Sequence, residues 1–129
     1  MINRAGFADL HIHTTFSDGK YSPEEVIGFA KSTGIDTMSI TDHDSVDAFF
    51  NIDLAKLDIT LFPGVELSTY HKGKDVHVLG YLFDINDNKF SDMLKNYRDV
   101  RNNRAEIMLE RLAKHGFVFK DEDKESILT

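Results

Sequence analysis

Imidazole and carboxylate side chains recur through the first two thirds of this 129-residue sequence, beginning with a His-x-His pair. In chain order, the positions that could carry chemistry are His11, His13, Asp18, Asp42, His43, Glu66 and His77. Borderline divalent ions such as Zn²⁺, Mn²⁺ and Fe²⁺ accept imidazole and carboxylate ligands together. A carboxylate such as Glu66 can also bridge two ions about 3.5–4 Å apart, as two-metal hydrolases require. The residue set therefore predicts a metal centre.

Such a centre would supply its own nucleophile. Bound ions lower the pKa of a coordinated water toward ~7, which makes hydroxide available at neutral pH. No protein nucleophile is then needed, which agrees with the absence of cysteine from the chain. The same absence excludes disulfides, thiolate zinc sites and cysteine-based catalysis.

Each of these residues also has a structural explanation when taken alone. A His-x-His pair on a strand is more often structural, Asp18-Gly19 is typical of a turn, and Asp42 could cap the helix after it. Glu66 or His77 alone would indicate nothing. Their joint occurrence at the ends of successive predicted strands favours the metal centre, because that edge of an α/β sheet is where sites form.

Alternating and helical patterns predict the elements that position these residues. Period-2 alternation over 7–13 predicts a strand with Leu10 and Ile12 on one face and both histidines on the other. Residues 14–20 form a loop. A capping box at Ser22–Glu25 begins a helix that Gly34 ends, and its buried stripe is Val26, Ile27, Phe29 and Ala30. Strands over 37–41 and 59–62, with a weaker helix over 46–56, complete a strand–helix alternation and an α/β class.

The second half of the chain predicts a hairpin and a long helical stretch. Strands at 65–70 and 76–83 flank a turn at 71–75, and a helical pattern covers 90–114 as one helix or two. Its apolar positions Tyr97, Ile107, Met108 and Leu112 are expected to pack in the core. Arg98, Arg101 and Arg104 share one helix face and could bind phosphate, or they could pair in solvent with Asp99, Glu106 and Glu110. His71 and His115 are expected to lie outside the site.

Composition limits the classes of partner. The net charge of −7 argues against extensive wrapping of nucleic acid, and no apolar run approaches a membrane span. The N-terminus has no apolar run typical of a signal peptide. We therefore expect a cytoplasmic domain, or a piece of one, without membrane partners.

Four motifs in order resemble those of the PHP (polymerase and histidinol phosphatase) family. They are DLHIHT at 9–14 with SDG at 17–19, TDHD at 41–44, GVE at 64–66 and VHVLG at 76–80. The resemblance implies the N-terminal part of a distorted (β/α)7 TIM-like barrel. It also implies two to three divalent ions of Mn, Zn or Fe. His11 and His13 would hold one ion, with Glu66 bridging to another, Asp18 and His43 a second, and His77 with Glu66 a third. Asp42 would orient or polarise a ligand, so Asp42 and Glu66 are the expected catalytic residues.

The stretch 97–108 resembles the start of the helical insertion in the stand-alone phosphoesterase branch of that family. There the insertion supplies arginine to substrate phosphate, which implies this role for Arg98, Arg101 and Arg104. The resemblance divides the chain into a metal-binding barrel part, 1–87, and the start of an insertion, 88–129. It implies a metal-dependent phosphoesterase that hydrolyses a phosphate monoester or diester of a nucleotide or a short nucleic-acid end.

The chain departs from the family in length. Family domains exceed about 200 residues, as barrels do, and supply further ligands late in the chain. We therefore expect the C-terminal half of the domain to be absent and the short chain to be weak or inactive. We also expect exposed sheet edge and apolar surface that favour homo-oligomerisation. The alternatives are a non-catalytic metal-binding or structural PHP module, and another hydrolase on the same layout, such as a histidinol-phosphate or phosphotyrosine phosphatase or an amidohydrolase-like enzyme.

Overall fold

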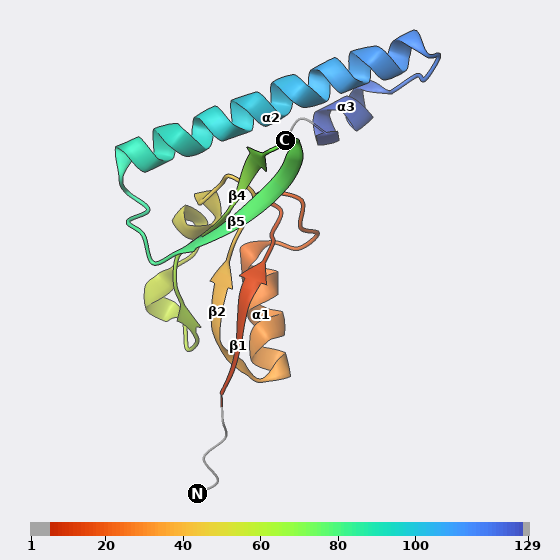
Figure 1. Ribbon diagram of the computed structural model, residues 1–129. Helices are drawn as coiled ribbons and strands as arrows, with labels where there is room; N and C mark the ends of the chain where they lie inside the picture. Colours follow the sequence, from red (N-terminus) through yellow and green to blue (C-terminus); the bar gives the residue numbers. More distant parts are fainter. Residues whose placement is uncertain (1–5, 128–129) are drawn as a thin grey trace, which may run out of the picture.

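The computed structural model describes residues 6–127, so expectations that fall on residues 1–5 and 128–129 lie outside it. Strands and helices alternate at first and are followed by a hairpin and two helices (Figure 1). In chain order they are β1 (Phe7–Ile12), α1 (Pro23–Thr33), β2 (Ile35–Ile40), 3-10 helices η1 (Asp47–Asn51) and η2 (Leu54–Lys56), β3 (Thr60–Leu61), β4 (Gly64–His71), β5 (Lys74–Tyr81), α2 (Asn88–Lys114) and α3 (Asp121–Ile127). The predicted α/β class is confirmed.

Two sheets carry the site. The first is parallel in the order β1-β2-β3, and the second is the antiparallel hairpin β4-β5. A parallel bridge between His43 and Glu66 joins the chain just beyond β2 to the start of β4. The Tyr81 hydroxyl donates to the Leu10 carbonyl oxygen at 2.8 Å, which ties the end of β5 to β1. The hairpin therefore extends from the parallel sheet toward α2 (Figure 1).

Helix α1 begins and ends where the sequence predicts. The Ser22 hydroxyl accepts the Glu25 N–H, and the Glu25 carboxylate accepts the Ser22 N–H at 2.8 Å. Gly34 ends the helix with φ +83°, a left-handed conformation that glycine adopts without strain. The expectation for Phe29 is wrong, because its side chain is 50% exposed. Phe29 instead packs edge-on against Tyr21, with ring centroids 4.9 Å apart.

The apolar core lies between α1, the parallel sheet and the segment 45–59. Met38 and Ile40 of β2 are fully buried at its centre. Other buried members come from α1, the 45–59 segment, β4 and α2, namely Val26, Ile27, Ala30, Val46, Ala48, Phe49, Ile59, Val65 and Leu94. Burial of the strand that ends just before Asp42 and His43 fixes their backbone in place.

The segment expected to be a helix over 46–56 is two short 3-10 helices instead. Polar side chains there bond to nearby backbone, since the Ser45 hydroxyl accepts the Asp47 N–H and the Asn51 side chain donates to the Asp47 carbonyl oxygen. Such bonds compete with the α-helical pattern. The periodic pattern of apolar residues gives no information about these competing hydrogen bonds.

Helix α2 is one continuous helix of 27 residues, capped by the Asp87 side chain. Only Leu94 is buried among its residues, and the expected core stripe is wrong: Ile107 and Met108 are 50% and 52% exposed. The cause is that the part of α2 after Arg104 passes beyond the hairpin (Figure 1), where α3 and the segment 117–119 lie beside it among the described residues. None of the helices within 6–127 combines the length and apolar character needed to cross a lipid bilayer.

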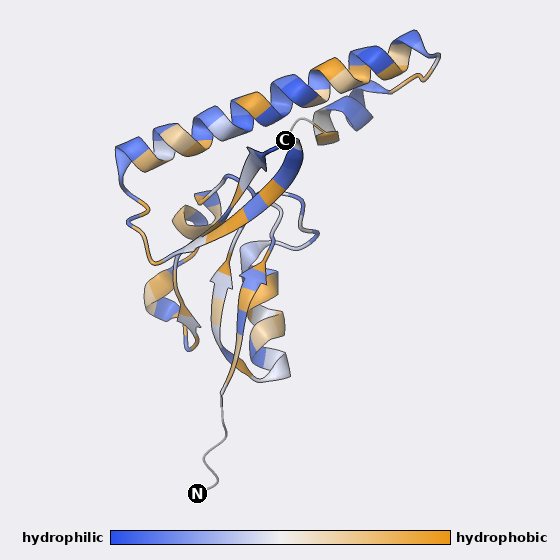
Figure 2. Ribbon diagram, in the orientation of Figure 1, coloured by the Kyte–Doolittle hydropathy of each residue, from blue (hydrophilic) through white to orange (hydrophobic). Residues whose placement is uncertain are grey.

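One face of the hairpin leaves apolar side chains exposed. Val76 and Val78 of β5 lie on the face opposite Glu66, and they are 41% and 46% exposed. Figure 2 shows hydrophobic segments along β5. Such a surface is consistent with the homo-oligomer expected from the sequence, which stays a prediction.

Candidate metal centre

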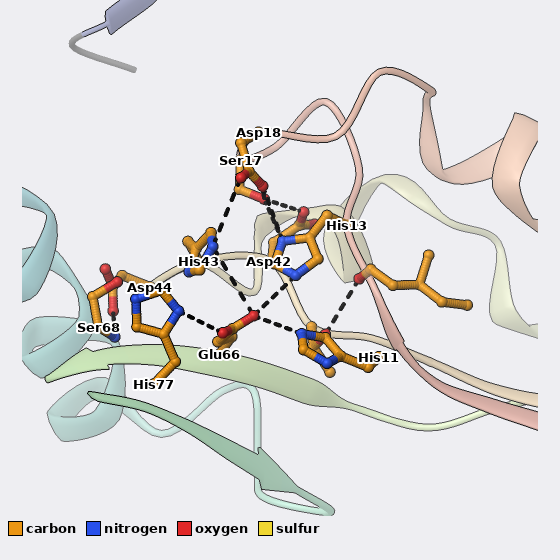
Figure 3. A network of polar contacts seen from close by, with 12 residues as sticks. His11, His13, Ser17, Asp18, Asp42, His43, Asp44, Glu66, Ser68 and His77 are labelled. Carbon is orange, nitrogen blue, oxygen red and sulfur yellow. Dashed lines mark hydrogen bonds and ion pairs between the residues drawn. The ribbon is translucent and has the colours of Figure 1, made fainter. Parts of the chain in front are cut away.

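Glu66 lies at the centre of a group of histidines (Figure 3). One carboxylate oxygen, Oε2, lies 2.7 Å from His11 Nε2 and 2.9 Å from His13 Nε2. The other, Oε1, lies 2.7 Å from His77 Nδ1. The Glu66 side chain is only 7% exposed, whereas the imidazoles of His11 and His77 are about half exposed. A single carboxylate thus contacts three histidines from two separate parts of the chain, the end of β1 and β5.

Backbone pairing brings these elements together. His11 and His13 lie two residues apart at the end of β1 and point to one side, with ring centroids 5.2 Å apart. The Glu66 N–H donates to the Asp42 carbonyl oxygen at 3.2 Å, which places β4 beside His43. His77 pairs across the hairpin with Ser68, which lies two residues beyond Glu66. The side chains of His77 and Glu66 are therefore on the same face of the hairpin. The expected convergence at strand ends is present.

The loop after β1 delivers Asp18. Its Oδ1 lies 3.0 Å from His13 Nδ1, and its Oδ2 lies 3.8 Å from His43 Nε2. The Gly19 N–H donates to the Thr14 carbonyl oxygen at 2.9 Å, which closes the turn. A Cβ at Gly19 would overlap the His13 backbone, so a side chain there would push the loop away. Glycine is required at this turn to bring the Asp18 carboxylate to the histidines.

Three overlapping groups of side chains could each hold a metal ion. Within each group the donor atoms lie within 4.8 Å of one another. The groups are His11, His13 and Glu66; His13, Asp18 and His43; and His43, Glu66 and His77. They contain all six residues that the family resemblance implied as ligands. Neutral imidazoles and carboxylates are the donor set that Mn, Zn and Fe ions accept, so the residues fit such ions.

Asp42 lies behind this group rather than within it. It is fully buried and accepts three hydrogen bonds, from the Thr14 N–H (2.7 Å), the Thr14 hydroxyl (2.6 Å) and the Ser17 hydroxyl (2.6 Å). These bonds fix the loop that carries Asp18. The alternative role as a helix cap does not match them, because η1 has no side-chain cap. Asp42 therefore orients the residues that face the site.

The three arginines contact protein carboxylates and a carbonyl oxygen. Arg98 Nη1 donates to the Asp44 carbonyl oxygen at 2.7 Å, and Arg101 Nη1 lies 3.7 Å from Asp44 Oδ2. Arg104 makes a two-point contact with Asp75 of β5, at 2.9 and 3.3 Å. Arg104 thus pairs with the hairpin, not with the acidic residues of its own helix considered above.

A cleft of about 500 Å³ lies between the hairpin and α2, beside the candidate metal centre. Its lining includes His77, which joins the cleft to the histidine group, and two of the three arginines. The full set is Ser68, Thr69, Tyr70, Asp75, His77, Tyr97, Val100, Arg101 and Arg104. Aromatic rings and guanidinium groups next to a candidate metal centre could accommodate a phosphorylated organic molecule.

Burial and charge oppose each other at the two central groups. Burial raises the pKa of Glu66, but hydrogen bonds with His11 and His77 outweigh it and hold that pKa below its ordinary value. Burial lowers the pKa of His43, and the nearby Glu66 and Asp18 carboxylates offset only part of this effect. An ionised carboxylate and a neutral imidazole are the forms that bind metal.

We expect acidification to destabilise the metal-free protein through His43. The pKa of His43 in the folded chain is lower than the ordinary 6.5. Below about pH 6.5 the unfolded chain therefore binds more protons than the folded chain, and the free energy of unfolding decreases as the pH is lowered. Urea unfolding at about pH 7.5 and about pH 5.5, with chelator present, measures this slope. His43→Gln should give a smaller difference between the two pH values than the parent chain, and an equal or larger difference would contradict the role of His43.

Sequence reasoning missed Asp44 and the aromatic lining of the cleft. Asp44 is fully buried and contacts both Ser68 and the arginines, yet no periodic pattern marks it. The available signal was its place in the TDHD motif, next to a candidate ligand. Tyr97 was assigned to the core, but the structure places it in the lining of the cleft.

Together the fold and the site define an α/β domain with a group of histidine and carboxylate side chains at the ends of its strands that could hold metal ions. The PHP domain family matches residues 9–120, and the chain belongs to this family. It is 37% identical to the 5′-3′ exoribonuclease Rnm of Escherichia coli over 116 residues, 87% of this chain and 40% of that protein. It is 32% identical to the 3′,5′-nucleoside bisphosphate phosphatase of Chromobacterium violaceum over 102 residues, 78% of this chain and 36% of that protein.

Solved structures agree with the assignment. A protein of Bifidobacterium adolescentis described as a metal-dependent phosphoesterase superposes with TM-score 0.83 at 28% identity, covering 97% of this chain and 44% of that one. An amidohydrolase from Chromobacterium violaceum gives TM-score 0.78 at 31% identity, covering 87% and 40%. The chain spans about 40% of the length of the curated relatives it matches.

Proposed function

We propose that this chain forms the metal-binding part of a phosphoesterase that hydrolyses phosphate esters of nucleotides or nucleic-acid ends. The observation that carries the proposal is the sharing of Glu66, His13 and His43 among three groups of potential metal ligands. Overlapping ligand groups can hold neighbouring ions, as two-metal hydrolysis requires. The proposal covers two to three ions of Mn, Zn or Fe, held by His11, His13, Asp18, His43, Glu66 and His77.

The ions, when bound, would activate water and stabilise negative charge on phosphoryl oxygens. The chain's own residues would do the positioning. Glu66 places one carboxylate oxygen toward His11 and His13 and the other toward His77, so it could bridge two ions. Asp42 would fix the loop that bears Asp18.

The substrate assignment depends on the cleft and on the relatives. Arg101 and Arg104 line the cleft, with Arg98 one turn earlier on α2, and guanidinium groups bind phosphate in bidentate fashion. Relatives named as an exoribonuclease and as a nucleoside bisphosphate phosphatase favour a nucleotide or nucleic-acid end over histidinol phosphate or phosphotyrosine. A similar solved structure that carries sulfate, an analogue of phosphate, also supports an anionic substrate.

A non-catalytic metal-binding module is the second candidate. The observation that favours it is length, because the chain spans about 40% of those relatives and their remaining residues could complete the site. This candidate predicts metal binding and association without hydrolysis. The cytoplasmic location also remains a proposal from the sequence.

The test is phosphate release by the chain after loading with Mn²⁺, measured on a panel of substrates. The panel contains a nucleoside 3′,5′-bisphosphate, a short 5′-phosphorylated RNA, histidinol phosphate and phosphotyrosine. We expect weak metal-dependent release from the nucleotide or RNA, because the chain spans about 40% of the relatives' length, and His13→Ala should abolish it. His71→Gln is the control, because His71 lies outside the three groups. Bound metal with neither release nor nucleotide binding would contradict the proposal and favour the second candidate.

A further inference from the structure

Asp44 is a buried carboxylate with an unusual backbone. It is fully buried, and its φ of +51° lies in the left-handed region that few residues other than glycine, asparagine and aspartate adopt. A buried carboxylate is costly unless other groups compensate its charge. The contacts of Asp44 therefore have to explain why an aspartate stands at this position.

One set of contacts joins Asp44 to β4. Its N–H donates to the Glu66 carbonyl oxygen at 3.0 Å, and its Oδ1 accepts the Ser68 N–H at 2.8 Å. The first of these bonds is part of the parallel His43–Glu66 bridge, and the second lies two residues farther along β4. Asp44 is thus held firmly to the strand that carries the central carboxylate of the metal centre.

A second set of contacts joins Asp44 to α2. Its carbonyl oxygen accepts from Arg98 Nη1 at 2.7 Å, and its Oδ2, which has no hydrogen-bond partner among the described residues, lies 3.7 Å from Arg101 Nη1. The Arg101 guanidinium is the positive charge that faces the carboxylate oxygen, and the Arg98 guanidinium contacts the backbone of the same residue. The apolar contacts of α2 with the core, made by Phe90, Met93 and Leu94, lie near its start, so the contacts with Asp44 hold the next turns of the helix.

We propose that Asp44 is a positioning residue that docks α2 beside the metal centre and sets the place of the Arg101 guanidinium. The inference goes beyond the proposed function, since it concerns how two parts of the fold are held together. The cleft between the hairpin and α2 includes residues of both, among them His77 and Arg101. Its shape therefore depends on the docking of α2, and Asp44 joins that docking to the histidine group.

Asp44→Asn isolates the charge. Asparagine keeps an oxygen that can accept the Ser68 N–H, tolerates the left-handed backbone, and leaves the carbonyl contact with Arg98 in place. The attraction for Arg101 is the main interaction removed. Arg101→Gln removes the same attraction from the other side. Asp99→Asn, at an exposed position of α2, is the control with the same change of charge.

The position of α2 can be measured directly because the chain has no cysteine. Spin labels on Glu24→Cys in α1 and Asn103→Cys in α2, both exposed positions, report the distance between the two helices. We expect Asp44→Asn and Arg101→Gln each to broaden the distance distribution, and the double variant to broaden it no further than the larger single effect. Asp99→Asn should leave it unchanged, and Mn²⁺ stoichiometry should be the same in all variants.

A second measurement, which rests on the proposed function, is the binding of inorganic phosphate to the Mn²⁺-loaded chain. Displacement of Arg101 in Asp44→Asn should weaken phosphate binding on the order of threefold, the scale of a partly exposed ion pair. Unchanged label distances, or additive effects in the double variant, would overturn the inference. So would tighter phosphate binding in Asp44→Asn, which would mean that Asp44 only competes with phosphate for Arg101. Loss of metal from the parent chain would instead contradict the proposed function and leave the label result to decide the role of Asp44.

Discussion

Glu66→Gln is expected to reduce the affinity of the chain for Mn²⁺ by more than about 100-fold. Loss of residues that only orient a ligand costs about 10- to 100-fold in metal affinity, and Glu66 is itself a candidate ligand. It belongs to two of the three groups, so its loss weakens both at once. Glutamine keeps the shape of the side chain but removes its negative charge, which the surrounding histidines favour, as the lowered pKa of Glu66 shows.

The measurement is Mn²⁺ binding followed by electron paramagnetic resonance, with circular dichroism to show that the variant is folded. His71→Gln serves as the control because it changes a histidine on the same hairpin that belongs to none of the three groups. It should bind Mn²⁺ as the parent does. Equal binding by Glu66→Gln and the parent would mean that ions bind elsewhere or that the histidines alone suffice.

The candidate site could be predicted from sequence to the extent that short motifs carry it. The pair His11 and His13, and the sequence around His43, are local patterns whose geometry follows from strand periodicity and from the position at strand ends. The contacts of Arg98 and Arg101 with Asp44 could not be predicted in this way. They join residues more than 50 positions apart, and they depend on where α2 crosses the hairpin.

The fold likewise has features that local sequence signals predict and features that depend on tertiary packing. The capping box at Ser22 and the glycine after α1 are local signals, and the structure has both. The segment 46–56 differs from the predicted helix because side-chain bonds to nearby backbone compete with it. The exposure of Ile107 and Met108 was not predicted because periodicity indicates which face of a helix is apolar, not whether any partner covers it. Tertiary packing decides that question, and α2 extends past the elements that could cover its second half.

Asp42→Ala is expected to destabilise the metal-free protein by about 3 kcal/mol, a cost in the upper part of the range for single substitutions. Asp42 is fully buried and accepts three short hydrogen bonds from Thr14 and Ser17. Alanine removes all three acceptor contacts and leaves the buried Thr14 N–H and hydroxyl unpaired, and each such group costs about 1–3 kcal/mol. Urea unfolding in chelator measures the change, with Asp92→Ala at an exposed site of α2 as the control.

Asp42→Ala should also separate metal binding by the group that contains Asp18 from metal binding by the groups that contain Glu66. Without Asp42, the loop after β1 loses its anchor, so Asp18 would no longer be held 3.0 Å from His13. Metal should then bind weakly to the group of His13, Asp18 and His43. The group of His11, His13 and Glu66 should still bind metal, because β1 and β4 continue to hold its side chains in place. Asp42→Ala, examined below its unfolding transition, should therefore lose part of the bound Mn²⁺, whereas Glu66→Gln should lose more, because Glu66 belongs to two of the three groups. Full Mn²⁺ content in Asp42→Ala would show that the loop keeps its place without these hydrogen bonds.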